Sequence, residues 1–433
     1  MREASRVVIV GDMMRGLFCI ALAAGCSSPA AQAQPVPAGS AAPAVDAGVP
    51  AAIGACAPIE ESSQAPIHDQ LALTKAAFAD LPGWADDHFS EAVPSFLASC
   101  KKLDELKDTD LVGTDGHGGR AKQWRHACAA ASKLKAGDDA AAKAFFEAEF
   151  VPYVAAGKAG PVGKLTGYYV QEMHASRKKQ GAFKYPVLGR PADLVMVDLS
   201  PFVRDAHGRR IWGRLDGSGE LVPYYTRAEI RAGALAKQKL ELMYVDDPID
   251  LLFANIEGSA KAKLDDGTVV WLEFAGKNGR AYKGVGGLLK ELGELKPGEG
   301  TMIGIRKWFN DHAARYDEIA DQDASYVFFK ESPQPGAVGS QKVILTTRRS
   351  LAVDRAFIAA STPVWVDAKA PIVGKPGTEA WQHLLVAQDT GAGIQGAVRG
   401  DIYWGDDRDA EELGGRMGGA GRYWILLPKG VTK

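Results

Sequence analysis

The chain of 433 residues has almost no net charge, because its 51 Lys and Arg residues nearly balance its 53 Asp and Glu residues and leave −2. A protein that holds DNA or RNA needs a positive field against the phosphates, so nucleic acid is excluded as the main partner. Long apolar runs are also missing. The one stretch that resembles a membrane span, LFCIALAAG at 17–25, is too short to cross a bilayer, which excludes a polytopic membrane protein.

Cysteine is scarce as well, with five residues and no CxxC pair, and the eight histidines show no metal-binding spacing. A zinc site is therefore not expected, and no other metal or cofactor is expected either. Cys100 and Cys128 lie at matching places on two expected helices, and we expect them to form a disulfide in an oxidising compartment. The alternative is a pair of buried free thiols. Cys56 has no expected partner.

The N-terminus has the layout of an export signal. Arg15 precedes the apolar run and small residues follow it. The segment LAAGC resembles a lipobox, in which Cys26 is acylated and becomes the mature N-terminus, and Ser27 favours sorting to the outer membrane. The alternative is cleavage after AQA at Ala33, which yields a soluble periplasmic protein. We expect residues 1–25 to be a signal peptide and the mature chain to be an outer-membrane lipoprotein that faces the periplasm.

Residues 26–60 are rich in Ala and Pro and have too little large apolar surface to fold. We interpret them as a semi-extended tether. The whole chain is 46% apolar and 24% charged, which is typical of globular proteins. The folded part is therefore expected to begin near residue 61.

The hydrophobic pattern of the folded part changes along the chain. Apolar residues at helical spacing predict helices at 91–106, 121–134 and 138–154, the last with Asp138 as its N-cap. After residue 160, short β-type runs follow one another, separated by Gly, Pro and Asp. Strands and helices do not alternate, which argues against a doubly wound parallel sheet. The expected fold class is mainly β with a helical N-terminal part, built as two β-barrels or sandwiches.

Two motifs in the C-terminal part imitate known sites. The segment GAGIQG at 391–396 satisfies the dinucleotide pattern GxGxxG, but that pattern requires a following helix, and the residues after it are strand-like. The triplet Asp389-Thr390-Gly391 matches that of aspartic proteases, in which two carboxylates share one proton. It occurs once, so a protease would have to be a dimer, which we keep as a minor alternative.

Three aspartates in the same part favour a carbohydrate site. Asp354, Asp389 and Asp401 each lie at the end of a β-type run beside small residues, and loops at strand ends are where a scaffold presents side chains for binding. A single Asp in such a place commonly caps a turn. Three of them close to the aromatic pair Tyr403 and Trp404 favour sugar binding, because sugar faces stack on aromatic rings.

Motifs in a fixed order from about 96 to 428 resemble the membrane-bound lytic murein transglycosylase A family. The resemblance rests on LTGYYVQEMHAS at 165–176, IEGSAKAKL at 256–264, SLAVDRAF at 350–357 and LLVAQDTGAGIQGAVRGDIYWG at 384–405. It implies a double-psi β-barrel with a C-terminal three-aspartate domain, interrupted by a second, inserted β-barrel. The first barrel is expected from residues 61–178 plus 331–433, and the insert from residues 179–330.

The resemblance also implies a chemistry. A lytic exotransglycosylase cleaves the β-1,4 bond between N-acetylmuramic acid and N-acetylglucosamine with the muramic 6-hydroxyl as nucleophile, which leaves 1,6-anhydromuramic ends. The residues themselves do not distinguish exo from endo action. Ordinary glycosidases need two carboxylates, whereas here one carboxyl, implied to be Asp401, acts first as acid and then as base. Asp389 and Asp354 are implied to position Asp401 or the substrate. The implied sugar contacts are Thr166, Gly167, Tyr168, Gly258, Ser259, Tyr403 and Trp404.

The chain departs from the family pattern around the expected groove. The family usually has Gln where Glu257 stands, Gly where Ala260 stands, and GGAIKG where this chain has GAGIQG. The usual Pro-Leu-Gly after Asp354 is also missing. These departures keep open a second hypothesis, a non-catalytic lipoprotein that binds peptidoglycan. The expected partners are glycan strands, the outer membrane through a lipid anchor, and other cell-wall enzymes.

Overall fold

The computed structural model describes residues 69–114, 116–199, 201–203, 210–296, 298–391 and 393–431. They belong to one compact unit, Glu60–Lys433. The expected signal peptide, the lipidation site Cys26, the cleavage site at Ala33 and the tether lie outside the described residues. No helix within the described ranges is both long and apolar enough to cross a membrane.

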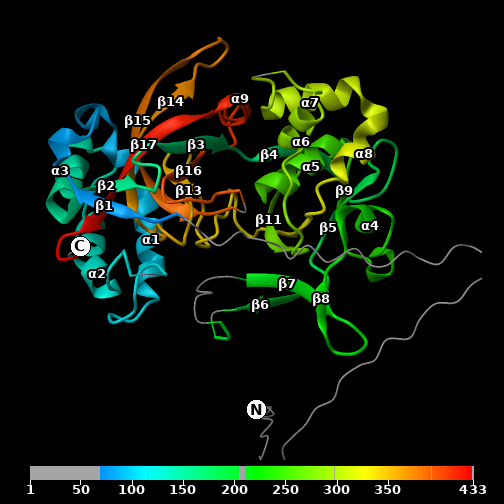
Figure 1. The fold of residues 1–433 in the computed structure, drawn as a ribbon, viewed down its shortest axis with the longest axis horizontal. Coiled ribbons are helices and arrows are strands. Elements are labelled where there is room, and N and C mark those ends of the chain that lie inside the picture. The colour runs from blue at the N-terminus through cyan, green and yellow to red at the C-terminus, as the bar shows by residue number, and fades with distance from the viewer. Residues whose placement is uncertain are drawn as a thin grey trace, which may run out of the picture. The chain divides into compact units, whose positions relative to one another are not determined.

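Helices dominate the first part of the described chain (Figure 1). Their bounds are η1 (Phe78–Asp80), η2 (Trp84–Asp86), η3 (Phe89–Glu91), α1 (Val93–Asp104), α2 (Ala121–Ala131) and α3 (Asp139–Glu149). Asp138 caps α3 as predicted, since its carboxylate accepts a hydrogen bond from the N–H of Ala141 at 2.9 Å. The expectation that this helix continues to residue 154 is wrong, because strand β2 (Phe150–Ala156) begins directly after it. Pro152, which cannot continue a helix, lies within that strand.

The first sheet closes on itself and forms a barrel. Six strands make the ring in the order β3, β17, β14, β15, β13, β16, and β16 pairs again with β3. β2 and β1 extend the sheet from β17. The bounds are β1 (Ala72–Lys75), β3 (Gly163–Tyr168), β13 (Ser350–Val353), β14 (Pro363–Pro371), β15 (Thr378–Asp389), β16 (Arg399–Tyr403) and β17 (Gly418–Pro428). Helix α9 (Ala410–Arg416) lies between β16 and β17 in the chain.

Alternation along the strands supplies two apolar cores. Val364 and Val366 of β14 point into the barrel, whereas Trp365 between them packs against the helical layer of α1, α2 and α3. The same division holds on β15, where Leu385 lies in the barrel and Leu384 lies against the helices. Since successive side chains of a strand point to opposite faces, one set of strands holds the barrel and its helical layer together.

The second sheet is a six-stranded, nearly closed barrel with the strand order β12, β11, β10, β4, β9, β5. A bridge between Gly189, directly after β5, and Phe329 of β12 brings its two ends together. The bounds are β4 (Gln171–Ser176), β5 (Tyr185–Leu188), β9 (Glu241–Val245), β10 (Ala260–Leu264), β11 (Val269–Lys277) and β12 (Val327–Glu331). Its helices are α4 (Arg227–Arg231), η4 (Ala236–Gln238), α5 (Pro248–Glu257), α6 (Val285–Glu291), α7 (Met302–Asp311), η5 (Ala313–Arg315) and α8 (Tyr316–Ala320).

A three-stranded sheet belongs to the same stretch of chain, made of β6 (Val195–Asp198), β7 (Arg210–Leu215) and β8 (Leu221–Pro223). The chain leaves the first barrel after β3, forms the second, and returns after β12, so the expected mainly β fold with one barrel interrupting another is confirmed. The crossing lies at residues 169–170, before the boundary expected at 178/179, because β4 pairs with β10 and β9 of the second barrel.

Candidate active site

Four strands of the first barrel place four residues in one row across the sheet. Thr166 of β3 lies opposite Asp401 of β16, Asp401 lies opposite Ala352 of β13, and Ala352 lies opposite Asp389 of β15. Adjacent strands are about 4.8 Å apart, so the Cα atoms of the two aspartates lie roughly 10 Å apart. Only the methyl group of Ala352 stands between them in the row.

The row points away from the interior of the barrel. Leu165 and Ile402, which are the chain neighbours of Thr166 and Asp401, are fully buried in the barrel core. Because side chains alternate along a strand, Thr166 and Asp401 must point outward, and both are partly exposed. The outer surface of β3 and β16 is therefore the surface that presents the candidate acid.

A β-bulge brings Asp389 to the same surface. Leu351 of β13 pairs with Ala387, but the next residue, Ala352, pairs with Asp389 rather than with Gln388. Gln388 is thus an extra residue in β15, and such a bulge re-aims the side chains that follow it. Without the bulge, Asp389 would have the same orientation as Ala387, which is buried in the barrel core.

Asp401 is partly buried and has one hydrogen-bond donor beside it. The hydroxyl of Thr166 donates to Asp401 Oδ1 at 2.5 Å. Burial raises the pKa of Asp401 to about 6, and the charge of Asp389 acts in the same direction, whereas Arg399, the Thr166 hydrogen bond and Lys164 lower it. A carboxyl group with this pKa still carries its proton in part of the molecules near neutral pH, so Asp401 can act as a general acid.

Asp389 is held more firmly than Asp401. Its Oδ2 accepts from the Tyr168 hydroxyl at 2.9 Å, and its Oδ1 accepts from the N–H groups of Ser340 and Thr390 at 2.8 Å each. Burial raises the pKa of Asp389, while these hydrogen bonds lower it. Three donors on two oxygens fix the orientation of this carboxylate, which suits a positioning group better than a group that must exchange protons.

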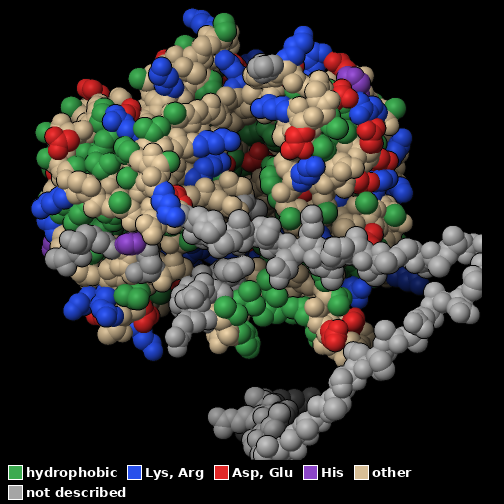
Figure 2. All heavy atoms as spheres, viewed as in Figure 1, with side chains coloured by type: hydrophobic (Ala, Val, Ile, Leu, Met, Phe, Trp, Pro, Cys, Tyr) green, Lys and Arg blue, Asp and Glu red, His purple; other side chains and the backbone are tan. Residues whose placement is uncertain are grey.

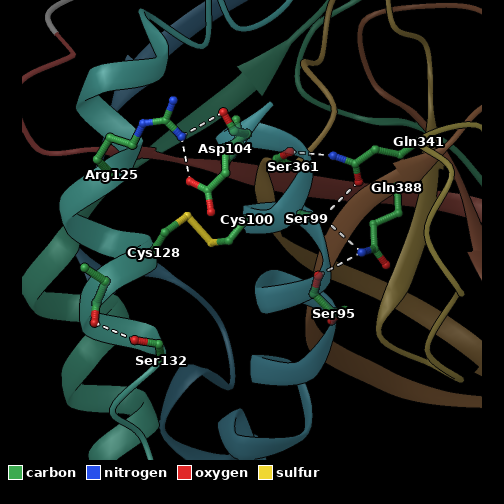
Figure 3. The surroundings of a disulfide bond; sticks show 12 residues. Ser95, Ser99, Cys100, Asp104, Arg125, Cys128, Ser132, Gln341, Ser361 and Gln388 are labelled. Carbon is green, nitrogen blue, oxygen red and sulfur yellow. Dashed lines mark hydrogen bonds and ion pairs between the residues drawn. A yellow bond between two sulfur atoms is a disulfide. The ribbon is translucent and has the colours of Figure 1, made fainter. Parts of the chain in front are cut away.

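The residue before Asp389 is tied to the helical layer (Figure 3). The side-chain amide of Gln388 donates to the carbonyl oxygen of Ser95 at 2.8 Å and to the hydroxyl of Ser99 at 2.9 Å, both in α1. The Ser99 hydroxyl donates in turn to Gln341, whose amide donates to Ser361. Helix α1 therefore fixes the position of Gln388 and, through it, the end of β15 that carries Asp389.

A disulfide joins this helix to its neighbour. Cys100 of α1 is bonded to Cys128 of α2, with a Cα–Cα distance of 5.6 Å, which is the pairing that the sequence favoured. Figure 3 shows the bridge on the side of α1 that points away from Gln388. The disulfide thus holds the helix that holds the end of β15.

Asp354 has different hydrogen-bond partners from the other two aspartates. Its Oδ1 accepts from the N–H of Ala356 at 3.0 Å and its Oδ2 accepts from the N–H of Gly396 at 2.7 Å, and the residue is buried. Its carboxylate fastens Gly396, which precedes β16, to the end of β13, and the expected role of Asp354 in positioning Asp401 or the substrate stays a prediction. After the GAGIQG segment comes strand β16, not a helix, as expected for a segment that does not bind a dinucleotide.

The aromatic residues expected to contact sugar are buried. Trp404 is 2% exposed in the barrel core, with its ring 5.3 Å from that of Trp381. A Cβ atom on Gly167 would lie 2.4 Å from the indole Nε1, so glycine is needed there for packing. Trp404 is therefore a core residue, whereas Gly167 is partly exposed and its sugar contact stays a prediction. Tyr403 is also buried, 5.3 Å from the ring of Tyr168.

The second barrel contributes the end of α5. Gly258 follows the helix with a φ of 76°, and the position of a Cβ on it is open space, while Ser259 is buried. Ala260 pairs with Gln171 directly after the crossing between the barrels. This register places the end of α5 beside β3, next to the row that carries Asp401.

Glu257, the last residue of α5, is a third carboxyl group at the site. Burial raises its pKa well above the ordinary value, the charges of Asp401 and Asp389 raise it further, and the N–H of Tyr169 lowers it. Burial and the two neighbouring charges therefore favour the uncharged form of Glu257. The sequence marked it only as a departure from a motif, and its place directly before Gly258 and Ser259 was the feature that could have identified it.

Figure 2 shows a hollow in the surface, with acidic side-chain surface inside it and Lys and Arg side chains along its rim. Within the described part of the chain, no group of three or more His, Cys, Asp or Glu is arranged to hold a metal ion.

Known proteins share both halves of this architecture. Residues 164–330 match the MltA specific insert domain, and residues 349–427 match the 3D domain. A crystal structure of a membrane-bound lytic murein transglycosylase from Agrobacterium tumefaciens is 29% identical, with a TM-score of 0.72 over 83% of this chain and 98% of that one. MltA from Neisseria gonorrhoeae is 31% identical, with a TM-score of 0.68 over 84% of this chain and 94% of that one.

The chain belongs to the membrane-bound lytic murein transglycosylase A family. Two curated members carry that family name. The protein of Escherichia coli (strain K12) is 32% identical over 268 residues, which are 61% of this chain and 65% of that protein. The protein of Vibrio cholerae is 31% identical over 271 residues, which are 60% and 64% of the two chains. The chain thus matches slightly less than two thirds of the length of these relatives.

One solved member of the family holds a sugar chain. E. coli MltA with bound chitohexaose is 25% identical to this chain, with a TM-score of 0.58 over 82% of this chain and 91% of that one.

Proposed function

We propose that the chain is a peptidoglycan lytic transglycosylase that cleaves the bond between N-acetylmuramic acid and N-acetylglucosamine. The observation that carries the proposal is the row in which Asp401, with a pKa raised to about 6, faces a fixed Asp389 across Ala352. Family membership and the chitohexaose bound by E. coli MltA support a glycan strand as the substrate.

In this mechanism Asp401 acts twice. Its protonated carboxyl group gives a proton to the glycosidic oxygen as the bond from C1 of the muramic residue to that oxygen breaks. The muramic 6-hydroxyl then bonds to C1, and its proton returns to Asp401. The products are a free 4-hydroxyl on the leaving sugar and a 1,6-anhydromuramic end, so the proton balance closes on one carboxyl group.

Asp389 acts as a positioning residue in this scheme. Its negative charge raises the pKa of Asp401 and thereby keeps the acid protonated to a higher pH. Its own oxygens remain bound to Tyr168, Ser340 and Thr390. The Thr166 hydroxyl sets the orientation of Asp401 through its hydrogen bond.

The test is product analysis with Asp401→Asn as the matched variant. Asn keeps the shape of the side chain but neither delivers nor accepts the proton, so cleavage is expected to fall by at least about 10²–10⁴-fold while glycan binding is kept. Mass spectrometry of the products from purified sacculi is expected to show anhydromuramic ends. Reducing muramic ends would mean that water attacks and the enzyme is a hydrolase. No release by the wild type, with binding intact, would favour the non-catalytic lipoprotein.

The proposed site of action is the periplasmic face of the outer membrane, with the chain anchored through acylated Cys26. The support is the sequence LAAGCSS and the Ala- and Pro-rich tether behind it. Detergent fractionation of wild type and Cys26→Ala tests this. An anchored wild type and a soluble variant are expected, and equal solubility of both would favour cleavage at Ala33.

A further inference from the structure

The outward row of Thr166 and Asp401 continues along the same two strands. Lys164 lies opposite Arg399, two pairs before Thr166 and Asp401, in the same parallel register. Residues two apart on a strand share a face, so Lys164 and Arg399 lie on the outward surface about 7 Å along the strands from the candidate acid. Both cations act on the pKa of Asp401, which places them near it.

A cavity of about 380 Å³ opens at this end of the two strands. Its walls are the turn after β2, the start of β3 and the segment that leads into β16. Three cationic side chains line it, from Lys158, Lys164 and Arg399, together with a single acidic residue, Asp69.

The one acid in the wall is already engaged. Asp69 Oδ2 accepts from the N–H of Ala397, and Oδ1 accepts from the N–H groups of Lys158 and Gln70, at 2.8–2.9 Å. Hydrogen bonding to the Ala397 N–H is the largest influence on the pKa of Asp69 and lowers it. Asp69 therefore stays ionised and holds the backbone N–H groups of the cavity wall. The cavity is thus lined by three positive charges and one negative charge.

Arg399 is the least solvated of the three cations. Its guanidinium donates to the carbonyl oxygens of Lys164 and Gly400, and burial lowers its pKa. A partly desolvated guanidinium gains more from an anion than a fully hydrated one does. The cavity thus combines the shape and the charge of a site for a small anionic group.

We propose that this cavity binds a carboxylate of the substrate strand, carried by the muramic residue cleaved at Asp401. The proposal rests on the proposed function. The muramic residue is the sugar of the strand that carries an acidic substituent, through its lactyl ether and the peptide attached to it. Its C1 is the reacting atom at Asp401, so its substituent is within reach of a cavity that begins about 7 Å along the strands.

The test is binding in the Asp401→Asn background, which does not turn over. Three probes are compared: neutral chitohexaose, peptide-free glycan strands that carry lactyl carboxylates, and strands with intact peptides. Lys158→Gln/Lys164→Gln is expected to raise the Kd of acidic strands by about three- to tenfold, to reduce its salt dependence, and to leave the Kd of chitohexaose unchanged. Which acidic probe responds tells whether the lactyl or the peptide carboxylate is bound.

Two matched variants control the test. Lys158→Arg/Lys164→Arg keeps the charge and is expected to bind acidic strands like the parent. Lys369→Gln removes an exposed charge on β14, outside the cavity, and is expected to change nothing. Equal weakening for chitohexaose and acidic strands, or no weakening at all, overturns the carboxylate site. Failure of the parent to bind any glycan, and of the wild type to cleave sacculi, overturns the proposed function itself.

Discussion

The outer surface of the first barrel has two parts that differ in chemistry. Over β14 and β15 it is apolar and covered by helices, with Trp365, Leu384 and Val386 fully buried. Over β3 and β16 it is polar and partly exposed, with Thr166 and Asp401. Both sets are residues whose side chains point outward from the barrel. Alternation along each strand decides whether a side chain points inward or outward. Whether helices cover the outward face then decides whether that side chain supports the fold or is available for catalysis.

β15 serves both parts of the surface because of its bulge. Up to Gln388 its outward residues face the helices, and the side chain of Gln388 donates hydrogen bonds to two residues of α1. One residue later Asp389 joins the row opposite Ala352. The helix-covered part is thus the support for the catalytic part. The comparison predicts that changes beneath the helices act on stability, whereas changes in the row act on catalysis.

The largest stability effect is expected for Trp365→Ala. Trp365 is fully buried, packs on the rings of Trp84 and Phe89, and donates from Nε1 to Pro82 O at 3.1 Å. Loss of a large buried aromatic side chain is expected to lower the free energy of unfolding by about 3–5 kcal/mol. Chemical denaturation measures it, with Lys369→Ala, exposed on the same strand, as the control. A change below about 1 kcal/mol would contradict the division between the two parts of the surface.

The disulfide provides a second test of the supporting layer. Cys100 and Cys128 are 28 residues apart, and a loop of this size corresponds to about 3–4 kcal/mol of stability in the chain-entropy model. The double variant Cys100→Ser/Cys128→Ser is expected to unfold at lower denaturant and to keep its kcat/KM at low temperature. A reductant should destabilise the wild type and leave the variant unaffected. Loss of activity without loss of stability would mean that the bridge acts on Asp389 directly.

Local rules were enough to predict much of the fold. Helical spacing predicted the helices around α1, α2 and α3, the capping residue Asp138 is confirmed, and the change of hydrophobic pattern after residue 160 marked the start of the β-rich part. The end of α3 was missed, because the change from helix to strand at Phe150 is set by pairing with β17, which lies far away in the sequence.

The site was predictable by residue type but not by direction. Asp401 and Asp389 were identified, yet the bulge that turns Asp389 outward depends on a pairing with Ala352 that no local pattern shows. Trp404 looked like a sugar platform because it follows Tyr403, but alternation places it in the barrel core. Asp354 resembled its partners, and only the N–H groups of Ala356 and Gly396 reveal that it fastens a loop.

The pH dependence sharpens the assignment of the acid within the row. Asp401 must be protonated to act first, and with a pKa of about 6 its protonated fraction falls from about nine tenths at pH 5 to about one tenth at pH 7. kcat/KM is therefore expected to fall about tenfold over this range.

Two variants should move the alkaline limb of the pH profile, which is the range over which kcat/KM falls, in opposite directions. Thr166→Val removes a hydrogen bond that lowers the pKa of Asp401, so its limb should move to higher pH, whereas Asp389→Asn removes a charge that raises that pKa, so its limb should move to lower pH. A limb that stays in place in both variants would assign the titration to another group.

The smallest effect is expected for Glu257→Gln. Burial and the charges of Asp401 and Asp389 raise the pKa of Glu257 well above its ordinary value and so favour its protonated form. A protonated Glu and a Gln are uncharged side chains of the same shape that both donate a hydrogen bond. At pH 6 we therefore expect kcat/KM to change less than about threefold, which is less than 1 kcal/mol. Glu291→Gln, at the end of α6 and exposed, is the matched control for loss of a helix-terminal carboxyl group. A loss beyond about tenfold for Glu257→Gln alone would show that its proton takes part in the reaction, and the second barrel would then supply chemistry as well as a wall.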